Sequence, residues 1–410
     1  METKNRRTIL LGTLTLLLIY LYFLFEQTTH KPTKLIDKIS NIDTQQEEQK
    51  ALIYLNKLRQ GAGLIPFSST DILNTATKNH ANYLIKNLSY GHYEEPHKEG
   101  FTGKFASQRV VKEGYHTELI IENVSSNNRN YKESIDGLFA AIYHRFAFLD
   151  FQGDEIGIAI KQNYLDKRKT AFVYNIGSSA LNQLYKNSKK PSQKELTKAL
   201  DRYKELNNKI VTYPFDKQSD IPPVFFNEMP DPLPNHDVSG FPISISFNQA
   251  HFKDVKLLKF ELFDNKDRII SNTIIHDYKT DPNRRLNRFS FVLFPLDRLE
   301  WNQTYHINFL AVVDKELVEK KWSFQTRNYS IPLHKVDDET KTISVTVNKP
   351  NLFYFPPKSS KDLLHHIRYN PNFNMEFIDQ NTLKLTALKS SFITTNLKIG
   401  RHRLKLNIQN

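Results

Sequence analysis

The sequence predicts an α+β protein, with a mixed helical and sheet region first and a strand-rich region after it. Two patterns support this prediction. Apolar residues recur at helical spacing between positions 46 and 142, whereas apolar and polar residues alternate in short runs from position 242 onward. A chain of 410 residues with 39% hydrophobic residues is long enough for two or three domains, each with a core.

The first region, residues 46–179, is predicted to begin with helices and to end with a hairpin. Gly61-Ala62-Gly63 ends the first helix, and Ser69 or Thr70 is the expected N-cap of the second. The predicted elements are a helix before residue 61, helices over 71–87 and 132–142, and strands over 155–161 and 170–175. Helices followed by a hairpin predict a sheet that is covered by helices.

The second region is predicted to consist of two β-domains. Strands expected over 242–247, 258–263, 289–294, 306–310 and 322–326 predict an immunoglobulin-like β-sandwich at 238–327. Residues 328–410 are predicted to form a small β-rich domain, with strands over 343–347, 352–355, 382–386 and 403–407.

Residues 180–237 are predicted to link these regions. Ser192 and Glu195 form a capping-box pattern that starts a helix reaching about Asn208. Six prolines between positions 214 and 234 favour an extended spacer after it.

The N-terminus predicts a membrane anchor. Residues 9–25 form an uncharged run of 17 residues, and Lys4, Arg6 and Arg7 precede it. A helix of this length is close to the minimum that crosses a bilayer, and the positive residues predict that 1–8 stay in the cytoplasm. The remainder would be extracytoplasmic, with residues 26–45 as a tether. A cleaved signal peptide is the alternative.

The composition restricts the partners and the chemistry. The net charge of +13 favours anionic envelope polymers or lipid headgroups as partners. Lysine and arginine are scattered without a nucleic-acid-reading motif, so no nucleic-acid partner is expected. The chain has no cysteine, which excludes disulfides, thiolate metal sites and cysteine nucleophiles.

Five short segments resemble motifs of the CAP superfamily of cysteine-rich secretory, antigen 5 and pathogenesis-related proteins and their bacterial extracellular relatives. They are Gly91-His92, Gly100-Phe101-Thr102-Gly103, Gly114-Tyr115, Glu122-Asn123-Val124 and His144-Arg145. The resemblance implies a CAP-like α/β/α sandwich at 46–179, and the lack of cysteine points to the bacterial branch. Looser similarity to long bacterial CAP proteins and their Ig-like envelope modules extends over 210–327.

The resemblance also implies a site. His92, Glu122 and His144 occupy three positions of the histidine–glutamate tetrad that lines the CAP cleft, and Arg145 lies beside His144. Relatives with a complete tetrad have a second glutamate on the helix before the last histidine, where this chain has Ala141.

Three interpretations of His92, Glu122 and His144 stay open. The three side chains can hold Zn²⁺ with water in the fourth position, the arrangement of a catalytic zinc site. They can instead recognise a polar ligand without metal. The third possibility is a buried network with a purely structural role.

Other polar residues near the site have simpler expected roles. Arg109 and Arg145 are expected to pair with Glu122 or to hold a ligand carboxylate or phosphate. His80 is expected at the surface or at the edge of the groove, and Glu94 and Glu95 in a solvated acidic loop.

The expected function is binding or scaffolding of cell-envelope components, wall polymer or lipid, through the His/Glu cleft. The alternative is a metal-dependent hydrolase of cell-wall peptide or polysaccharide. Structural adhesion through the two β-domains is a third possibility.

Overall fold

The computed structural model describes residues 34–36, 41–167, 169–188, 190–336, 342–357, 362, 364, 367–379, 381–391, 394–399 and 402–410. The chain divides into two compact units, one spanning 38–330 with 357–363 and the other combining 1–37, 331–356 and 364–410. None of the described helices is long and apolar enough to cross a membrane. The anchor predicted at 9–25 lies outside the described residues.

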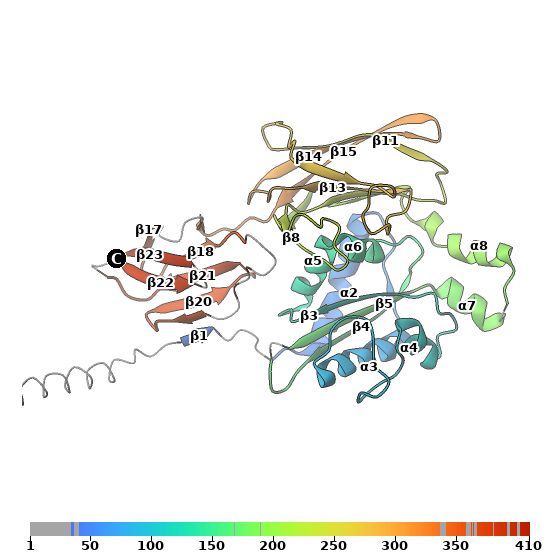
Figure 1. The fold of residues 1–410 in the computed structure, drawn as a ribbon, viewed down its shortest axis with the longest axis horizontal. Helices are drawn as coiled ribbons and strands as arrows, with labels where there is room; N and C mark the ends of the chain where they lie inside the picture. Colours follow the sequence, from blue (N-terminus) through green and yellow to red (C-terminus); the bar gives the residue numbers. More distant parts are fainter. Residues whose placement is uncertain are drawn as a thin grey trace, which may run out of the picture. The chain divides into compact units, whose positions relative to one another are not determined.

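A four-stranded sheet with helices on both faces forms the first part of the larger unit (Figure 1). Its strand order is β2-β4-β5-β3, and the long strands β4 (Glu155–Gln162) and β5 (Thr170–Gly177) form an antiparallel hairpin. The remaining elements are β2 (Ser68–Ser69), β3 (Ile121–Ser126), α2 (Thr44–Gly61), α3 (Asp71–Asn87), α4 (Ala106–Lys112), α5 (Tyr131–Ala140) and α6 (Ile142–Phe148). The mixed α/β prediction for this region is confirmed.

Helix α3 has the bounds that the sequence predicts. The side chain of Thr70 accepts a hydrogen bond from the backbone N–H of Leu73 and so caps the first turn. Leu88 ends the helix in the left-handed conformation, at φ 49°. Gly157 of β4 lies directly against α3, because a Cβ atom there would be 2.2 Å from the backbone carbon of Leu73.

The third helix, predicted over 132–142, corresponds to α5 and ends at Ala140. Ala141 is extended (φ −75°, ψ 111°), and a separate helix, α6, follows it. The backbone N–H of Ile142 donates to the carboxylate of Glu228, 2.6 Å away, instead of continuing the hydrogen bonds of α5. His144 therefore lies in a short helix of its own, α6, which the sequence did not predict.

The expected spacer contains strands. Helix α7 (Ser179–Asn187) and helix α8 (Gln193–Asp201), which starts at the predicted capping box, are followed by η1 (Lys204–Leu206). Strands β6 (Ile210–Tyr213) and β7 (Gln218–Ile221) then pair with β10 (Ile243–Phe247) and β15 (Glu316–Thr326) of the following region. The prolines fall between these strands and not within them, so they do not prevent pairing.

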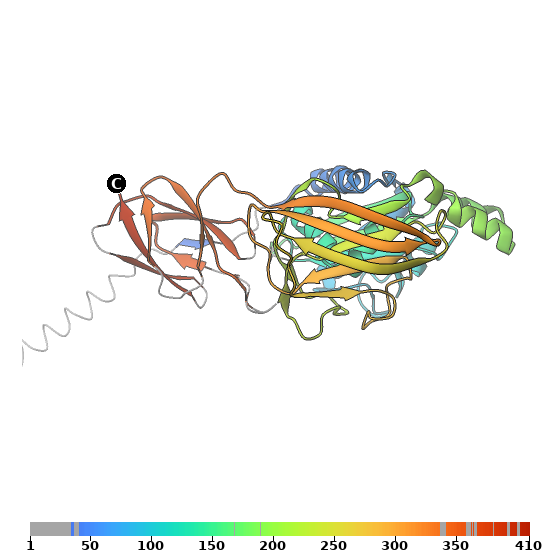
Figure 2. The same cartoon turned by 90° about the horizontal axis from the view of Figure 1, so that it is seen from above.

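The β-rich region of the larger unit consists mainly of two four-stranded sheets. Their orders are β12-β13-β10-β6 and β11-β14-β15-β7, and Figure 2 looks onto the long strands of the second sheet. The bounds are β8 (Phe225–Phe226), β9 (Val238–Ser239), β10 (Ile243–Phe247), β11 (Val255–Phe263), β12 (Thr273–His276), β13 (Ser290–Pro295), β14 (Thr304–Val313) and β15 (Glu316–Thr326). Phe247 of one sheet lies 5.7 Å from Phe309 of the other, measured between ring centroids, so the inner faces pack together.

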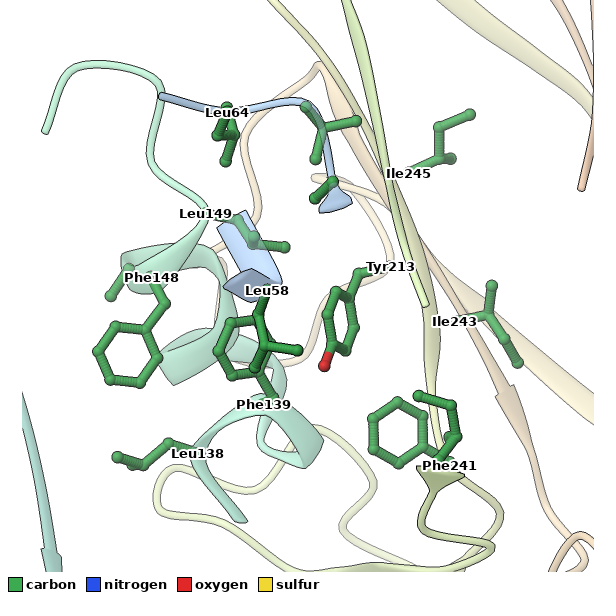
Figure 3. Close-up of a cluster of buried hydrophobic side chains, with 14 of the residues drawn as sticks. Leu58, Leu64, Leu138, Phe139, Phe148, Leu149, Tyr213, Phe241, Ile243 and Ile245 are labelled. Atoms are coloured by element: carbon green, nitrogen blue, oxygen red, sulfur yellow. The ribbon is translucent and has the colours of Figure 1, made fainter. Parts of the chain in front are cut away.

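One hydrophobic core joins the α/β part to these sheets. Leu58, Phe139 and Phe148 from the helices pack with Tyr213 of β6 and with Phe241 (Figure 3). The rings of Phe139 and Tyr213 are 4.6 Å apart. The two regions, predicted as separate domains, therefore share a buried interior.

The smaller unit is β-rich, as predicted. One sheet has the order β16-β18-β21-β20 and another β17-β23-β22. The bounds are β16 (Leu333–Lys335), β17 (Thr342–Thr346), β18 (Pro350–Tyr354), β19 (Ile367–Tyr369), β20 (Phe373–Phe377), β21 (Thr382–Ala387), β22 (Thr395–Ile399) and β23 (His402–Gln409). The segment 26–45 is predicted as a tether without a strand, but residues 34–36 within it form β1 (Lys34–Ile36), which pairs with β19.

Candidate functional site

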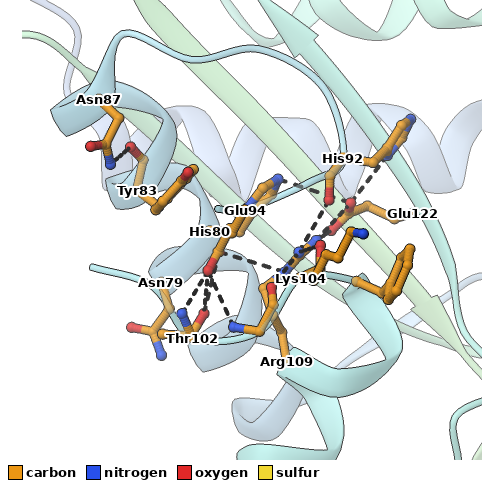
Figure 4. A network of polar contacts seen from close by, with 12 residues as sticks. Asn79, His80, Tyr83, Asn87, His92, Glu94, Thr102, Lys104, Arg109 and Glu122 are labelled. Atoms are coloured by element: carbon orange, nitrogen blue, oxygen red, sulfur yellow. Dashed lines mark hydrogen bonds and ion pairs between the residues drawn. The ribbon is translucent and has the colours of Figure 1, made fainter. Parts of the chain in front are cut away.

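His80 and Glu94 form the innermost part of a buried polar network (Figure 4). The Nδ1 atom of His80 is 2.9 Å from Oε1 of Glu94, and both side chains are 0% exposed. Glu94 also accepts a hydrogen bond from the backbone N–H of Thr102, 2.6 Å away. Burial raises the pKa of Glu94, but the bonds from His80 and Thr102 and the charge of Arg109 together outweigh it and leave that pKa below its ordinary value.

These positions correct two expectations, since neither His80 nor Glu94 is solvated. His80 lies four residues after Ala76 and four before Leu84, both of which face the core. The helical period therefore places its imidazole on the buried face of α3. This spacing was the signal in the sequence that could have identified it.

Arg109 links the network to Glu122. Its Nη2 atom donates to both carboxylate oxygens of Glu122, at 2.9 and 2.7 Å, and its side chain is 0% exposed. Its Nη1 atom donates to the backbone carbonyls of His92, Gly103 and Lys104. The expected pairing of Arg109 with Glu122 is present, and Arg109 also fixes the loop that carries His92.

Glu122 in turn orients His92. The Nδ1 atom of His92 lies 3.1 Å from Oε1 of Glu122, whose side chain is only 4% exposed. Burial raises the pKa of Glu122, while the bond from His92 and the charge of Arg109 lower it, with the net result below the ordinary value. An ionised carboxylate only accepts hydrogen bonds, so Nδ1 of His92 carries the proton and, in the neutral ring, Nε2 keeps its lone pair.

His144 has the same arrangement with a different carboxylate. Its Nδ1 atom lies 2.9 Å from Oε2 of Glu228, whose side chain is 3% exposed. The other oxygen of Glu228 accepts the N–H of Ile142 at the start of α6. Glu228 lies between β8 and β9, in the segment predicted as a linker, and no motif marks it. The only hint in the sequence was that Ala141 left the tetrad one carboxylate short.

The structure brings the two imidazoles together. The rings of His92 and His144 are stacked, with centroids 6.5 Å apart and planes inclined by 16°. The His92 side chain is 42% exposed and that of His144 18%. The site is thus a pair of accessible imidazoles, each held from behind by a buried carboxylate.

Arg145 does not belong to this site. Its side chain is fully buried, and it donates to the carbonyl of Phe139 and to Oγ of Ser244. Its guanidinium lies about 5 Å from the ring centroids of Tyr213 and Phe241. Successive residues of a helix point about 100° apart, so the neighbour of an outward-facing His144 enters the shared core.

The expected three-ligand zinc site does not fit the residues present. Both oxygens of Glu122 accept hydrogen bonds from Arg109, and one of them also from His92. Within the described part of the chain, no group of three or more His, Asp and Glu side chains can hold a metal ion. Of the three side chains predicted as metal ligands, only His92 and His144 keep a ligand atom, Nε2, that the hydrogen bonds described above do not use.

Exposed apolar side chains are the sequence neighbours of His92 and of Glu228. Tyr93, next to His92, is 63% exposed and meets the ring of Phe105 edge to face at 5.5 Å. Met229, next to Glu228, is 88% exposed. Each imidazole–carboxylate pair therefore has an exposed apolar residue as a sequence neighbour.

Three surface hollows lie elsewhere and include neither His92 nor His144. One of about 480 Å³ is lined by Phe263, His306 and Lys321 among others, and one of about 470 Å³ by residues of α2 and α3. A smaller one of about 220 Å³ lies near Leu119 and Leu181.

Residues 52–176 match the model of the CAP, cysteine-rich secretory protein family. The chain therefore contains a CAP domain, and the resemblance in the sequence is confirmed for this part. No curated protein sequence matches the chain.

Solved structures similar to the chain include an outer surface protein from Borrelia burgdorferi. It is 20% identical, with a TM-score of 0.30, and the match covers 34% of this chain and 98% of that one. An extracellular protein with an SCP domain from Bacillus anthracis is 17% identical, with a TM-score of 0.28. That match covers 33% of this chain and 41% of the Bacillus chain.

Proposed function

We propose that this is a membrane-anchored, extracytoplasmic CAP-domain protein that binds a cell-envelope component, wall polymer or lipid, through His92 and His144. The observation that supports this proposal most directly is the stacked pair of imidazoles, each with a buried carboxylate on Nδ1. The uncharged run at 9–25, which predicts an anchor, and the net charge of +13 support the cell-envelope setting.

The arrangement favours a ligand with hydrogen-bond donors. When the rings are neutral, their Nε2 atoms accept hydrogen bonds from hydroxyl, amide or ammonium groups. Glu122 and Glu228 hold both rings in place before a ligand arrives, so little conformational entropy is lost on binding. The negative carboxylates behind the rings also favour donors and cationic groups over anions.

The exposed aromatic side chains that follow His92 in the sequence favour a ligand that also has an apolar part. Tyr93 and Phe105 offer ring faces and edges, and Nζ of Lys104 lies 5.2 Å from the ring centroid of Phe105. Aromatic side chains beside hydrogen-bonding groups suit a sugar ring or the region of a lipid just below its headgroup.

Binding of the full-length protein to isolated wall fragments and to lipid vesicles tests the proposal. We expect His92→Ala and His144→Ala each to weaken binding to one of these materials about tenfold, the effect of losing one hydrogen bond to a partly buried group. His97→Ala, in an exposed loop position of the same region, is the matched control. Equal binding by all three variants would reject the histidine site, and binding that disappears in about 0.5 M salt for every variant would indicate charge alone.

The metal-dependent hydrolase lacks a supporting observation. Its carboxylate ligand would be Glu122, which is occupied by Arg109 and His92. Zinc addition to the binding assay is nevertheless informative, because His92 and His144 supply two nitrogen ligands. Binding that requires zinc and is lost in His144→Ala would indicate that the two histidines hold a metal ion when the ligand binds.

A further inference from the structure

The tip of the β4–β5 hairpin exposes two adjacent apolar side chains. Tyr164 is 84% exposed and Leu165 90%. With Met229, they are the most exposed large apolar side chains among the described residues. Single exposed apolar residues are common, but two neighbours at a projecting tip form a feature that needs an explanation.

An ordered turn keeps the side chains of Tyr164 and Leu165 exposed. Oδ1 of Asn163 accepts the backbone N–H groups of both Leu165 and Asp166 at 2.9 Å. The N–H of Lys169 donates to the carbonyl of Asp166, also at 2.9 Å. An Asx turn of this kind fixes the backbone, so the apolar side chains cannot fold back onto the sheet without breaking it.

Lysines accompany the aromatic side chains at this tip. Nζ of Lys167 is 4.7 Å from the ring centroid of Tyr164. Nζ of Lys169 donates to the hydroxyl of Tyr90, 2.8 Å away, and Tyr90 is itself 55% exposed. Tyrosine rings beside lysines with an apolar side chain between them are typical of protein surfaces at a membrane interface.

The N-terminal segment reaches the domain at this same hairpin. The backbone N–H of Ile42 donates to Oε1 of Gln162, the last residue of β4, at 3.1 Å. Ile42 follows the predicted anchor, which ends at Phe25, by 17 positions. The described chain therefore enters the CAP domain beside the hairpin that carries the exposed tip.

We infer that the β4–β5 hairpin tip is a second contact with the membrane, in which Tyr164 and Leu165 insert at the headgroup level and Lys167 and Lys169 bind anionic lipid. This inference rests on the membrane attachment in the proposed function. Because a single weak contact gives only reversible membrane binding, the tip acts by orienting an already anchored domain.

The absence of cysteine from the chain allows a clean experiment on the full-length protein. Leu165→Cys carries an environment-sensitive fluorophore at the tip, and Leu317→Cys, at a 67% exposed position on β15, is the matched control. Both proteins are mixed with vesicles of phosphatidylglycerol or phosphatidylcholine that contain nitroxide-labelled lipid. We expect quenching at position 165, strongest with phosphatidylglycerol, and none above background at 317.

Variants separate the two parts of the contact. Lys167→Gln with Lys169→Gln should weaken the association of the tip with phosphatidylglycerol vesicles, read from the quenching at 165, about thirtyfold, as expected for the loss of two cations near an anionic surface. Tyr164→Ser should shift the fluorophore toward a more aqueous emission. His97→Ala, the exposed loop control outside the histidine site, should leave the quenching unchanged.

Several outcomes would overturn the inference. Equal quenching at 165 and 317 in attached protein would mean that the anchor alone holds the chain. Failure of the full-length chain to attach to any vesicle would reject the anchor and the tip together. An emission change at 165 with isolated wall polymer, but not with vesicles, would assign the tip to the polymer.

Discussion

The Nδ1 atom of His144 lies 2.9 Å from Oε2 of Glu228, although 84 positions separate the two residues. The histidine belongs to the CAP domain and the glutamate to the segment that leads into the β-rich region. The position that carries a glutamate in relatives with a complete tetrad holds Ala141 here. A carboxylate from outside the matched family region thus serves one of the two histidines.

Glu228→Gln should change the tautomer of His144. The remaining amide oxygen can still accept the N–H of Ile142, but the new NH₂ group would face Nδ1 and can only donate. We therefore expect the ring proton to move to Nε2, which turns the accessible nitrogen from acceptor to donor. Nitrogen NMR of histidine-labelled protein distinguishes the tautomers, with His144→Ala providing the assignment. A ring that keeps its proton on Nδ1 would contradict the role given to Glu228.

Arg109→Leu should be strongly destabilising. It would leave Glu122 and Glu94 buried without their guanidinium and three backbone carbonyls without a donor. Removal of one partner from a buried ion pair typically costs about 3–5 kcal/mol. Lys98→Gln, at an exposed pair with Glu95, is the control and should leave the stability nearly unchanged, because solvent screens this pair. Urea unfolding of both variants measures the difference, and similar losses would mean that the network contributes little.

Acid should weaken the fold through the same network. The pKa values of Glu94 and Glu122 are lowered in the folded protein from an ordinary value of 4.5. Their contribution to stability is therefore complete above about pH 5 and is lost as the pH falls through about 4.5 toward the folded values. The free energy of unfolding should fall over this range, and less steeply in Glu122→Gln. An unchanged slope in this variant would remove Glu122 from the acid response.

Two phenylalanines test the division into units. Phe139 and Phe353 are both 1% exposed, the first in the core shared by the CAP domain and the two sheets, the second in the smaller unit. Each change to alanine should cost about 3–5 kcal/mol. In scanning calorimetry, Phe139→Ala should lower one transition that includes the CAP domain and both sheets. Phe353→Ala should lower a different one. A CAP transition separate from the sheets would contradict the shared core.

Two glycines of the CAP domain should respond oppositely to alanine. Gly137 is helical, and a Cβ atom there meets nothing within 4 Å, so Gly137→Ala should stabilise by about 0.5–1 kcal/mol. Gly157→Ala places its Cβ against the backbone of α3 and should destabilise by at least about 1–3 kcal/mol. Thermal unfolding of the pair measures both signs. Stabilisation by Gly157→Ala would mean that α3 moves away from the sheet at little cost.

Local patterns predicted the elements well, because capping and periodicity act over a few residues. Thr70 and the stripe of Leu73, Ala76 and Leu84 were sufficient to place α3. The resemblance named His92 and His144, which the structure brings together. Glu228 could not be predicted, since its role depends on how a proline-rich segment returns to α6. Arg145 was misplaced because it follows the outward-facing His144 in sequence, whereas the rotation of about 100° per helical residue directs its side chain into the core.

The dependence of His144 on Glu228 has a consequence for how the protein matures. A nascent chain that ends before the β8–β9 segment has all the family motifs but lacks one of the two supports for its imidazole pair. The protein would then become able to bind its ligand only late in synthesis, after Glu228 has been translated and the β8–β9 segment has folded against α6. Changes in the downstream sheets could likewise alter ligand preference while every signature residue stays the same.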